Sequence, residues 1–134
     1  MSLSIDHIVI TVEDINKSIN FYTNVLKMEL IEFYSSSDNT TRKSLKFGNQ
    51  KINLHEVLNP FSPCAKHPFP GAVDICFLSK KPVSEWLTIF KKNKIDIEDG
   101  PIQKTGATGP ILSIYIRDPD KNLIEISNLL INCN

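Results

Sequence analysis

The 134-residue chain has few cysteines, no net charge and no long apolar run. Its three cysteines, Cys64, Cys76 and Cys133, are odd in number and widely spaced, which fits neither a disulfide framework nor a CxxC zinc site. Fifteen basic residues balance 15 acidic ones, which argues against a general nucleic-acid binder. No segment has the length of a membrane span, and residues 1–4 lack the features of a signal peptide. We therefore expect a cytoplasmic protein with reduced thiols, in which Cys76 is a small core residue rather than a nucleophile.

One order of elements occurs twice along the chain. In each half, one strand precedes an amphipathic helix and three further strands follow it. We expect strands at 5–12, 30–34, 44–47 and 51–57, with a helix capped by Asp14, and then strands at 73–78, 95–97, 111–116 and 122–128, with a helix beginning at Pro82. Four prolines make 58–71 a linker, and three glycines make 100–110 a loop. The chain length suits one α+β domain, residues 1–134, built from βαβββ half-modules at about 4–57 and 72–130.

Four polar side chains stand on the first and last strands of the two halves: His7, His55, Asp74 and Glu125. His7 and His55 are about as far apart in the sequence as Asp74 and Glu125, so a pseudo-twofold axis would bring all four together. Imidazoles and carboxylates suit Zn, Mn, Fe, Co or Ni, and a cation would offset the cost of burying a carboxylate. A hydrogen-bonded or solvated position would also explain each residue taken singly, and Asp74 most easily.

Three segments carry a resemblance to a known family. They are the opening strand 6–12 with the helix that contains Phe21 and Tyr22, the hairpin 47–55, and the closing segment 115–126, in which a DPDGN-like turn delivers Glu125. Together they resemble the glyoxalase/bleomycin-resistance/extradiol-dioxygenase (vicinal oxygen chelate) superfamily over almost the whole chain. Segments 67–71, 74–76 and 105–110 are most similar to single-domain members of the glyoxalase-domain-containing-protein-5 type. The resemblance implies two βαβββ modules paired into a curved mixed sheet.

The resemblance also implies a function and a metal site. It implies a divalent-metal-dependent lyase or isomerase of lactoylglutathione-lyase type, with a small oxygen-chelating substrate, of which a glutathione adduct is one candidate. His7, His55, Asp74 and Glu125 would hold Zn, Ni, Mn or Fe, and Glu125 or Asp74 would move the proton. Asp74 stands where many relatives place histidine, and Lys121 replaces the usual turn glycine. The first departure weakens the main alternative, an Fe(II) extradiol-type dioxygenase.

Further residues are candidates for substrate binding. His67 in the linker could act as an acid or base near neutral pH, or could simply be a surface histidine. Tyr115 could line an apolar pocket, as in a non-enzymatic, antibiotic-resistance-like binding protein of the same superfamily. A glutathione-dependent version of the enzyme would also need cationic anchors, for which Arg42, Lys104 and Arg117 are available. The resemblance also implies a homodimer, in which the cup could be completed across the interface.

Overall fold

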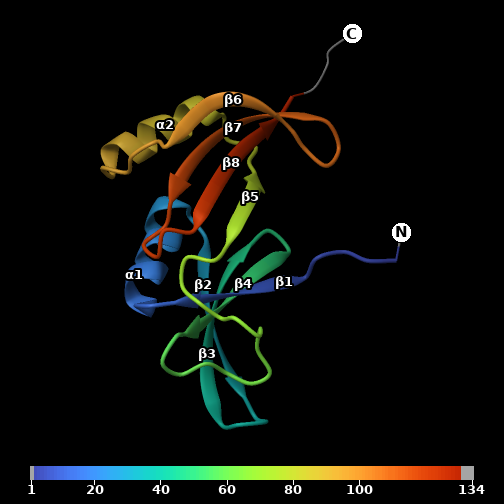
Figure 1. The fold of residues 1–134 in the computed structure, drawn as a ribbon, viewed down its shortest axis with the longest axis vertical. Helices are drawn as coiled ribbons and strands as arrows, with labels where there is room; N and C mark the ends of the chain where they lie inside the picture. Colours follow the sequence, from blue (N-terminus) through green and yellow to red (C-terminus); the bar gives the residue numbers. More distant parts are fainter. Residues whose placement is uncertain (1, 131–134) are drawn as a thin grey trace. The chain divides into compact units, whose positions relative to one another are not determined.

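The chain divides into two compact units between Ala72 and Val73. The computed structural model describes residues 2–130, so Cys133 lies outside the described part of the chain. Each unit has the order strand, helix, strand, strand, strand (Figure 1). Within residues 2–130, no helix combines the length and apolarity that crossing a bilayer requires.

The first unit is a four-stranded mixed sheet with a helical segment after its first strand. Its elements are β1 (His7–Val12), α1 (Ile15–Asn20), the π-helical turn η1 (Phe21–Val25), β2 (Glu29–Ser35), β3 (Thr40–Phe47) and β4 (Gln50–Glu56), with strand order β1-β4-β3-β2. Strand β1 runs parallel to β4, and the other neighbours are antiparallel. Asp14 caps α1 as expected, because its carboxylate accepts hydrogen bonds from the backbone N–H groups of Asn16 and Lys17.

The two faces of this sheet differ in polarity. Alternate residues of β1, β3 and β4 form an apolar core together with the helical segment, and these buried side chains are Ile10, Val12, Leu45, Ile52, Leu54, Tyr22, Val25 and Leu26. The opposite face carries polar residues that are also buried, namely Thr11, Ser44 and His55. Buried polar groups on a strand require a partner, so this face is where a ligand is to be sought.

The second unit repeats the topology of the first. Its elements are β5 (Asp74–Leu78), α2 (Val83–Lys92), β6 (Asp99–Thr105), β7 (Pro110–Arg117) and β8 (Leu123–Leu129), with strand order β5-β8-β7-β6. Its apolar face packs with α2 and buries Val83, Trp86, Phe90, Ile114, Ile116, Ile124 and Ile126. The expected βαβββ order of both halves is therefore confirmed, as is the α+β class.

One expected strand was placed wrongly. The sequence predicts a strand at 95–97 and a loop at 100–110, but β6 spans Asp99–Thr105. The loop was predicted from three glycines, yet β6 is an edge strand, where Gly100 and Pro101 are tolerated. The pairing of β6 with β7 shifts register between Asp99 and Ile102, and Gly100 absorbs this irregularity with a φ of 97°.

The turn before β8 fixes the position of Glu125. The buried Asp118 carboxylate accepts hydrogen bonds from the backbone N–H groups of Asp120 and Asn122 and from the Asn122 amide. The Asn122 Oδ1 atom accepts a hydrogen bond from the N–H of Val73, which ties the start of β8 to the start of β5. Lys121 takes a left-handed conformation, with φ 69°, which explains why glycine suits this position.

Candidate functional site

A cavity of about 500 Å³ opens on the polar face of the second unit. Four of its side chains carry chemical function: Cys76, Lys104, Tyr115 and Glu125. The strands also contribute apolar side chains, of which Leu78, Ile111 and Leu129 are the largest. Residues 105–108 complete the wall. The volume falls in the range of sites that bind small molecules.

Strand register brings three of these functional groups into one row. Glu125 on β8 pairs with Cys76 on β5 and with Tyr115 on β7, so the three side chains project from the same face. Asp74 lies on this face too, paired with Leu123 and therefore two residues before the level of Glu125. The structure thus places both predicted carboxylates of the second half on neighbouring strands and the same face.

The Glu125 carboxylate is held from below by two fully buried serines. Its Oε2 atom accepts a hydrogen bond of 2.5 Å from the Ser113 hydroxyl and one of 3.3 Å from Ser127. The two serine oxygens lie 2.6 Å apart, and the Cys76 sulfur lies 3.3 Å from the Ser127 oxygen. Each hydroxyl has one proton, so Ser113 donates to Glu125, and Ser127 shares its single proton between the Ser113 oxygen and the Glu125 carboxylate. The chain of donors therefore ends on the carboxylate and fixes its orientation.

The other two functional groups of this row remain protonated at neutral pH. Burial raises the pKa of the Tyr115 phenol to about 12, and the negative charge of Glu125 adds to this shift. Desolvation also raises the pKa of the Cys76 thiol, with a further contribution from Glu125. Cys76 is exposed and lines the cavity, so the expectation that it belongs to the core was wrong. Its high pKa argues against a nucleophilic role.

In the first unit, the predicted histidines share one face but differ in environment. His7 is exposed at the start of β1, and its Nδ1 lies 2.7 Å from a carboxylate oxygen of Asp6. His55 on β4 is only 6% exposed, and its Nδ1 has no hydrogen-bond partner within residues 2–130. His55 pairs with Thr11, whereas His7 pairs with Lys51, so the two histidines lie four residues apart along the strands.

Strand register reveals a residue that the sequence analysis missed. In β8, Glu125 lies two residues after Leu123, which pairs with Asp74. In β4, Asn53 lies two residues after Lys51, which pairs with His7. Asn53 is therefore the topological counterpart of Glu125, although spacing in the sequence pointed to His55. Among the described residues, the buried Oδ1 of Asn53 has no hydrogen-bond partner, and neither does the adjacent Ser44 hydroxyl. Spacing in the sequence and strand register point to different residues here because the loops of the two halves differ in length.

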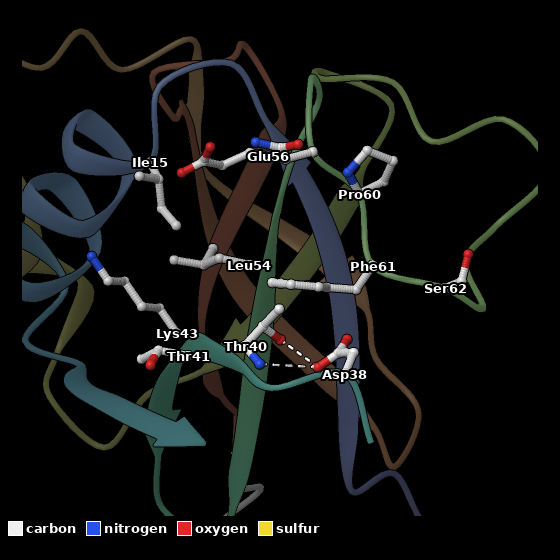
Figure 2. A pocket seen from close by; sticks show the side chains of 11 residues that line it. Ile15, Asp38, Thr40, Thr41, Lys43, Leu54, Glu56, Pro60, Phe61 and Ser62 are labelled. Carbon is white, nitrogen blue, oxygen red and sulfur yellow. Dashed lines mark hydrogen bonds between the residues drawn. The ribbon is translucent and has the colours of Figure 1, made fainter. Parts of the chain in front are cut away.

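A second cavity, of about 730 Å³, lies in the first unit. Figure 2 shows Phe61 at one side of it and Asp38 hydrogen-bonded to Thr40. The Phe61 ring meets the His55 ring edge to face, with centroids 5.2 Å apart, and the Arg42 guanidinium lies 4.2 Å from the Phe61 centroid. Hydrogen bonds from Thr40 and Arg42 lower the pKa of Asp38 to about 2. The charge of Arg42 is thus largely matched by Asp38, at an N–O distance of 2.6 Å.

Comparison with known proteins decides the family. Residues 4–126 match the model of the Glyoxalase/Bleomycin resistance protein/Dioxygenase superfamily. The chain belongs to this superfamily. The resemblance inferred from the opening, hairpin and closing segments is therefore confirmed.

Relatives within the superfamily are similar over most of their length. Virulence protein STM3117 of Salmonella typhimurium is 48% identical over 123 residues, which cover 92% of this chain and 82% of that protein. Its crystal structure matches with a TM-score of 0.88 at 45% identity, covering 97% and 99% of the two chains. Glyoxalase domain-containing protein RDO1 of Mycosarcoma maydis is 46% identical over 125 residues, 93% of this chain and 68% of that protein.

More distant solved structures share the glyoxalase-superfamily fold alone. A lactoylglutathione lyase from Agrobacterium tumefaciens matches with a TM-score of 0.69 at 24% identity, covering 93% of this chain and 92% of that one. The antibiotic-binding protein TnmS3 from Streptomyces sp. CB03234 matches with a TM-score of 0.73 at 16% identity, covering 97% and 99%. One fold therefore carries both an enzyme and a binding protein, and the choice between them rests on the residues of the site.

Two further residues predicted to bind substrate, His67 and Arg117, lie on different parts of the chain. His67 is exposed in the linker, and its ring stacks on Phe69 with centroids 6.3 Å apart. Arg117 donates two hydrogen bonds to the Glu98 carboxylate and one to the Lys121 carbonyl, so its guanidinium is engaged within the second unit. Among residues 2–130, the structure contains no ready-formed group of three or more His, Cys, Asp or Glu side chains able to hold a metal.

We expect folding stability to depend on pH through His55. Burial lowers the pKa of its imidazole, and the positive charge of Arg42 adds to the effect. The unfolded chain titrates near the ordinary value of about 6.5, so it binds the proton first as the pH falls. The contribution of His55 to the free energy of unfolding is therefore complete above about pH 6.5. Below that pH it declines, by at most about 1.4 kcal/mol per pH unit. Urea denaturation with chelator present, between pH 7.5 and 5.5, would measure this decline.

The matched control for this prediction is His67, the histidine in the linker. His55→Gln should flatten the pH dependence, whereas His67→Gln should leave it unchanged because that side chain is exposed. Equal pH dependence of the wild type and His55→Gln would contradict the prediction.

Proposed function

We propose that this chain is a metal-dependent glyoxalase-like enzyme, a lyase or isomerase that acts on a small oxygen-chelating substrate. The observation that supports this most is the environment of Glu125. An ionised carboxylate lines a cavity of the size of a substrate, on a strand flanked by a neutral phenol and a neutral thiol. Two buried serines donate hydrogen bonds to it.

The donor set suits a divalent metal ion. We propose His7, Asp74 and Glu125 as ligands, with His55, the residue expected from sequence, or Asn53 completing the set. Imidazole nitrogen and carboxylate oxygen are ligands shared by Zn, Ni, Mn and Fe. The unpartnered Oδ1 of Asn53 is a buried acceptor, which a cation would satisfy. The Arg42 guanidinium acts electrostatically on His55, which disfavours a second cation beside that imidazole.

The chemistry proposed for the chain follows from these groups. When bound, the metal would act as a Lewis acid on substrate oxygens. Glu125 or Asp74 would take a proton from one carbon of the substrate and return it to the neighbouring carbon. Tyr115, which stays protonated, can donate a hydrogen bond to a substrate oxygen in the same row. Ser113 and Ser127 keep the carboxylate of Glu125 in one orientation throughout.

Metal analysis and turnover test this proposal together. Protein purified without chelator should contain about one divalent ion per chain, and should convert the hemithioacetal of glutathione and a 2-oxoaldehyde. Chelation should remove both the ion and the activity. Metal-replete protein that is inert toward the hemithioacetal but consumes oxygen with a catechol would favour the dioxygenase instead. Protein that binds no metal would favour a binding protein.

We expect Ser113→Ala to weaken metal binding by about 10- to 100-fold, because partners that orient a ligand contribute that much to affinity. The variant removes the 2.5 Å hydrogen bond to Glu125 without changing a proposed ligand. Isothermal titration with Zn²⁺ or Ni²⁺ would measure the change. Ser84→Ala, at an exposed position on α2, is the matched control and should bind metal like the wild type. Unchanged affinity in Ser113→Ala would remove the serine pair from the proposed site.

We also propose that residues 1–134 act as one domain, and that the protein works as a homodimer in the cytoplasm. The superfamily assignment supports both proposals, because members of it commonly share this organisation. Sedimentation equilibrium should give twice the mass of 15.2 kDa. A single species at the mass of one chain would contradict the dimer.

A further inference from the structure

We propose that the substrate bound in the cavity of the second unit is a small anion, whose negative group is held by Lys104 and whose opposite end reaches Glu125. This inference rests on the proposed function only in assigning the Glu125 end to the reacting oxygens. The anionic character follows from the cavity itself and can be tested without metal.

The charges that line the cavity are few and well separated. Of its eleven lining residues, Lys104 is the one lysine or arginine and Glu125 the one aspartate or glutamate. No ion pair joins Lys104 to any residue between 2 and 130. Its ammonium group is therefore available to a ligand, while the Glu125 carboxylate already has two serine donors.

The positions of the two charges define the length of the ligand. Lys104 on β6 pairs with Ile111, whereas Glu125 pairs with Tyr115, four residues further along β7. Four strand residues span about 13 Å, and β7 lies between the strands that carry the two charges. The Lys104 side chain partly closes this distance, because its Nζ lies 6.0 Å from the centroid of the Tyr115 ring.

The wall between the charges is mainly apolar. Ile111, Leu129 and Leu78 line it together with the ring of Tyr115, and the last two leucines are substantially exposed. An apolar segment of a ligand would cover these side chains and gain free energy from their burial. The ligand class is therefore a monoanion, such as a carboxylate, with an aromatic or alkyl segment between its charge and its reacting oxygens.

A charged and an uncharged version of one probe test this inference. Chelator-treated protein would be titrated with 4-phenylbutanoate and with 4-phenylbutanamide, which differ in charge but hardly in shape, and binding would be followed by ¹H–¹⁵N NMR. The carboxylate should bind about two- to fivefold more tightly than the amide, the range expected of a solvent-exposed ion pair. The largest shifts should fall on residues 104–108 and on Tyr115.

Variants assign the preference to one side chain. Lys104→Met should bind both probes equally, and Lys104→Arg should retain the preference for the carboxylate. Lys92→Met, at the end of α2 and outside the cavity lining, should behave like the wild type. Equal binding of the two probes to the wild type, a preference that survives in Lys104→Met, or no binding of either probe would overturn the inference. A metal titration of the same samples tests the proposed function separately, because anion preference without metal binding would leave only the metal chemistry refuted.

Discussion

Glu125→Gln is expected to lower metal affinity by at least about 100-fold and to abolish metal-dependent turnover. The substitution keeps the shape of the side chain but removes the negative charge to which Ser113 and Ser127 donate. Loss of a charged ligand should exceed the 10- to 100-fold effect of removing a group that merely orients a ligand. Equilibrium dialysis against Zn²⁺ or Ni²⁺, with turnover of the hemithioacetal, would measure both losses.

Glu98→Gln provides the matched control in the same unit. Glu98 forms an exposed ion pair with Arg117, at 2.8 Å, and does not line the cavity. An exposed pair contributes little to stability, so this variant should keep its metal affinity and activity. Wild-type metal binding in a folded Glu125→Gln protein, verified by circular dichroism, would refute the role of Glu125 and the function built on it.

Gly100→Ala should be strongly destabilising, by about 3 kcal/mol or more in the free energy of unfolding. Gly100 has a φ of 97°, where a side chain is strained, and an added Cβ would overlap the carbonyl oxygen of Ser113. It would also lie 3.0 Å from the Cα of Ile114, so β7 itself would have to move. Urea denaturation followed by fluorescence of Trp86 would measure the loss.

Gly48→Ala separates backbone strain from steric overlap. Gly48 also has a positive φ, of 59°, but no atom lies within 4 Å of the position of an added Cβ. Only the conformational cost remains, so we expect a loss of about 1–2 kcal/mol. Similar stability losses in the two variants would show that close packing between β6 and β7 is not what requires glycine at position 100.

The topology of each unit could be predicted from local patterns, and one strand shows the limit of that method. Alternating apolar residues identify β1 and β8, and Asp14 and Pro82 mark the helix starts. Strand β6 was predicted as a loop because of the glycines at 100–110, and Gly100 and Pro101 are of types that usually interrupt strands. The edge position that tolerates them is a property of the sheet and is not visible in the local sequence.

The candidate site was predictable only in part for a related reason. Glu125 and Tyr115 could be found because the closing turn and the alternation of β7 and β8 fix their face. Ser113 and Ser127 gave the same signal, as polar residues on the face of Glu125 within apolar strands, but they were not singled out. Asn53 could not be found, because its equivalence to Glu125 depends on which residues pair across parallel strands.

The sequence alone determined the family, the order of elements in both halves and the carboxylate at the centre of the candidate site. These features depend on side-chain periodicity and on turn chemistry, which act between residues close in the chain. Tertiary structure alone decided the pairing register, the serine support beneath Glu125 and the exposure of Cys76. Such features depend on contacts between strands distant in sequence, whose alignment is fixed by loop length and core packing rather than by any local pattern.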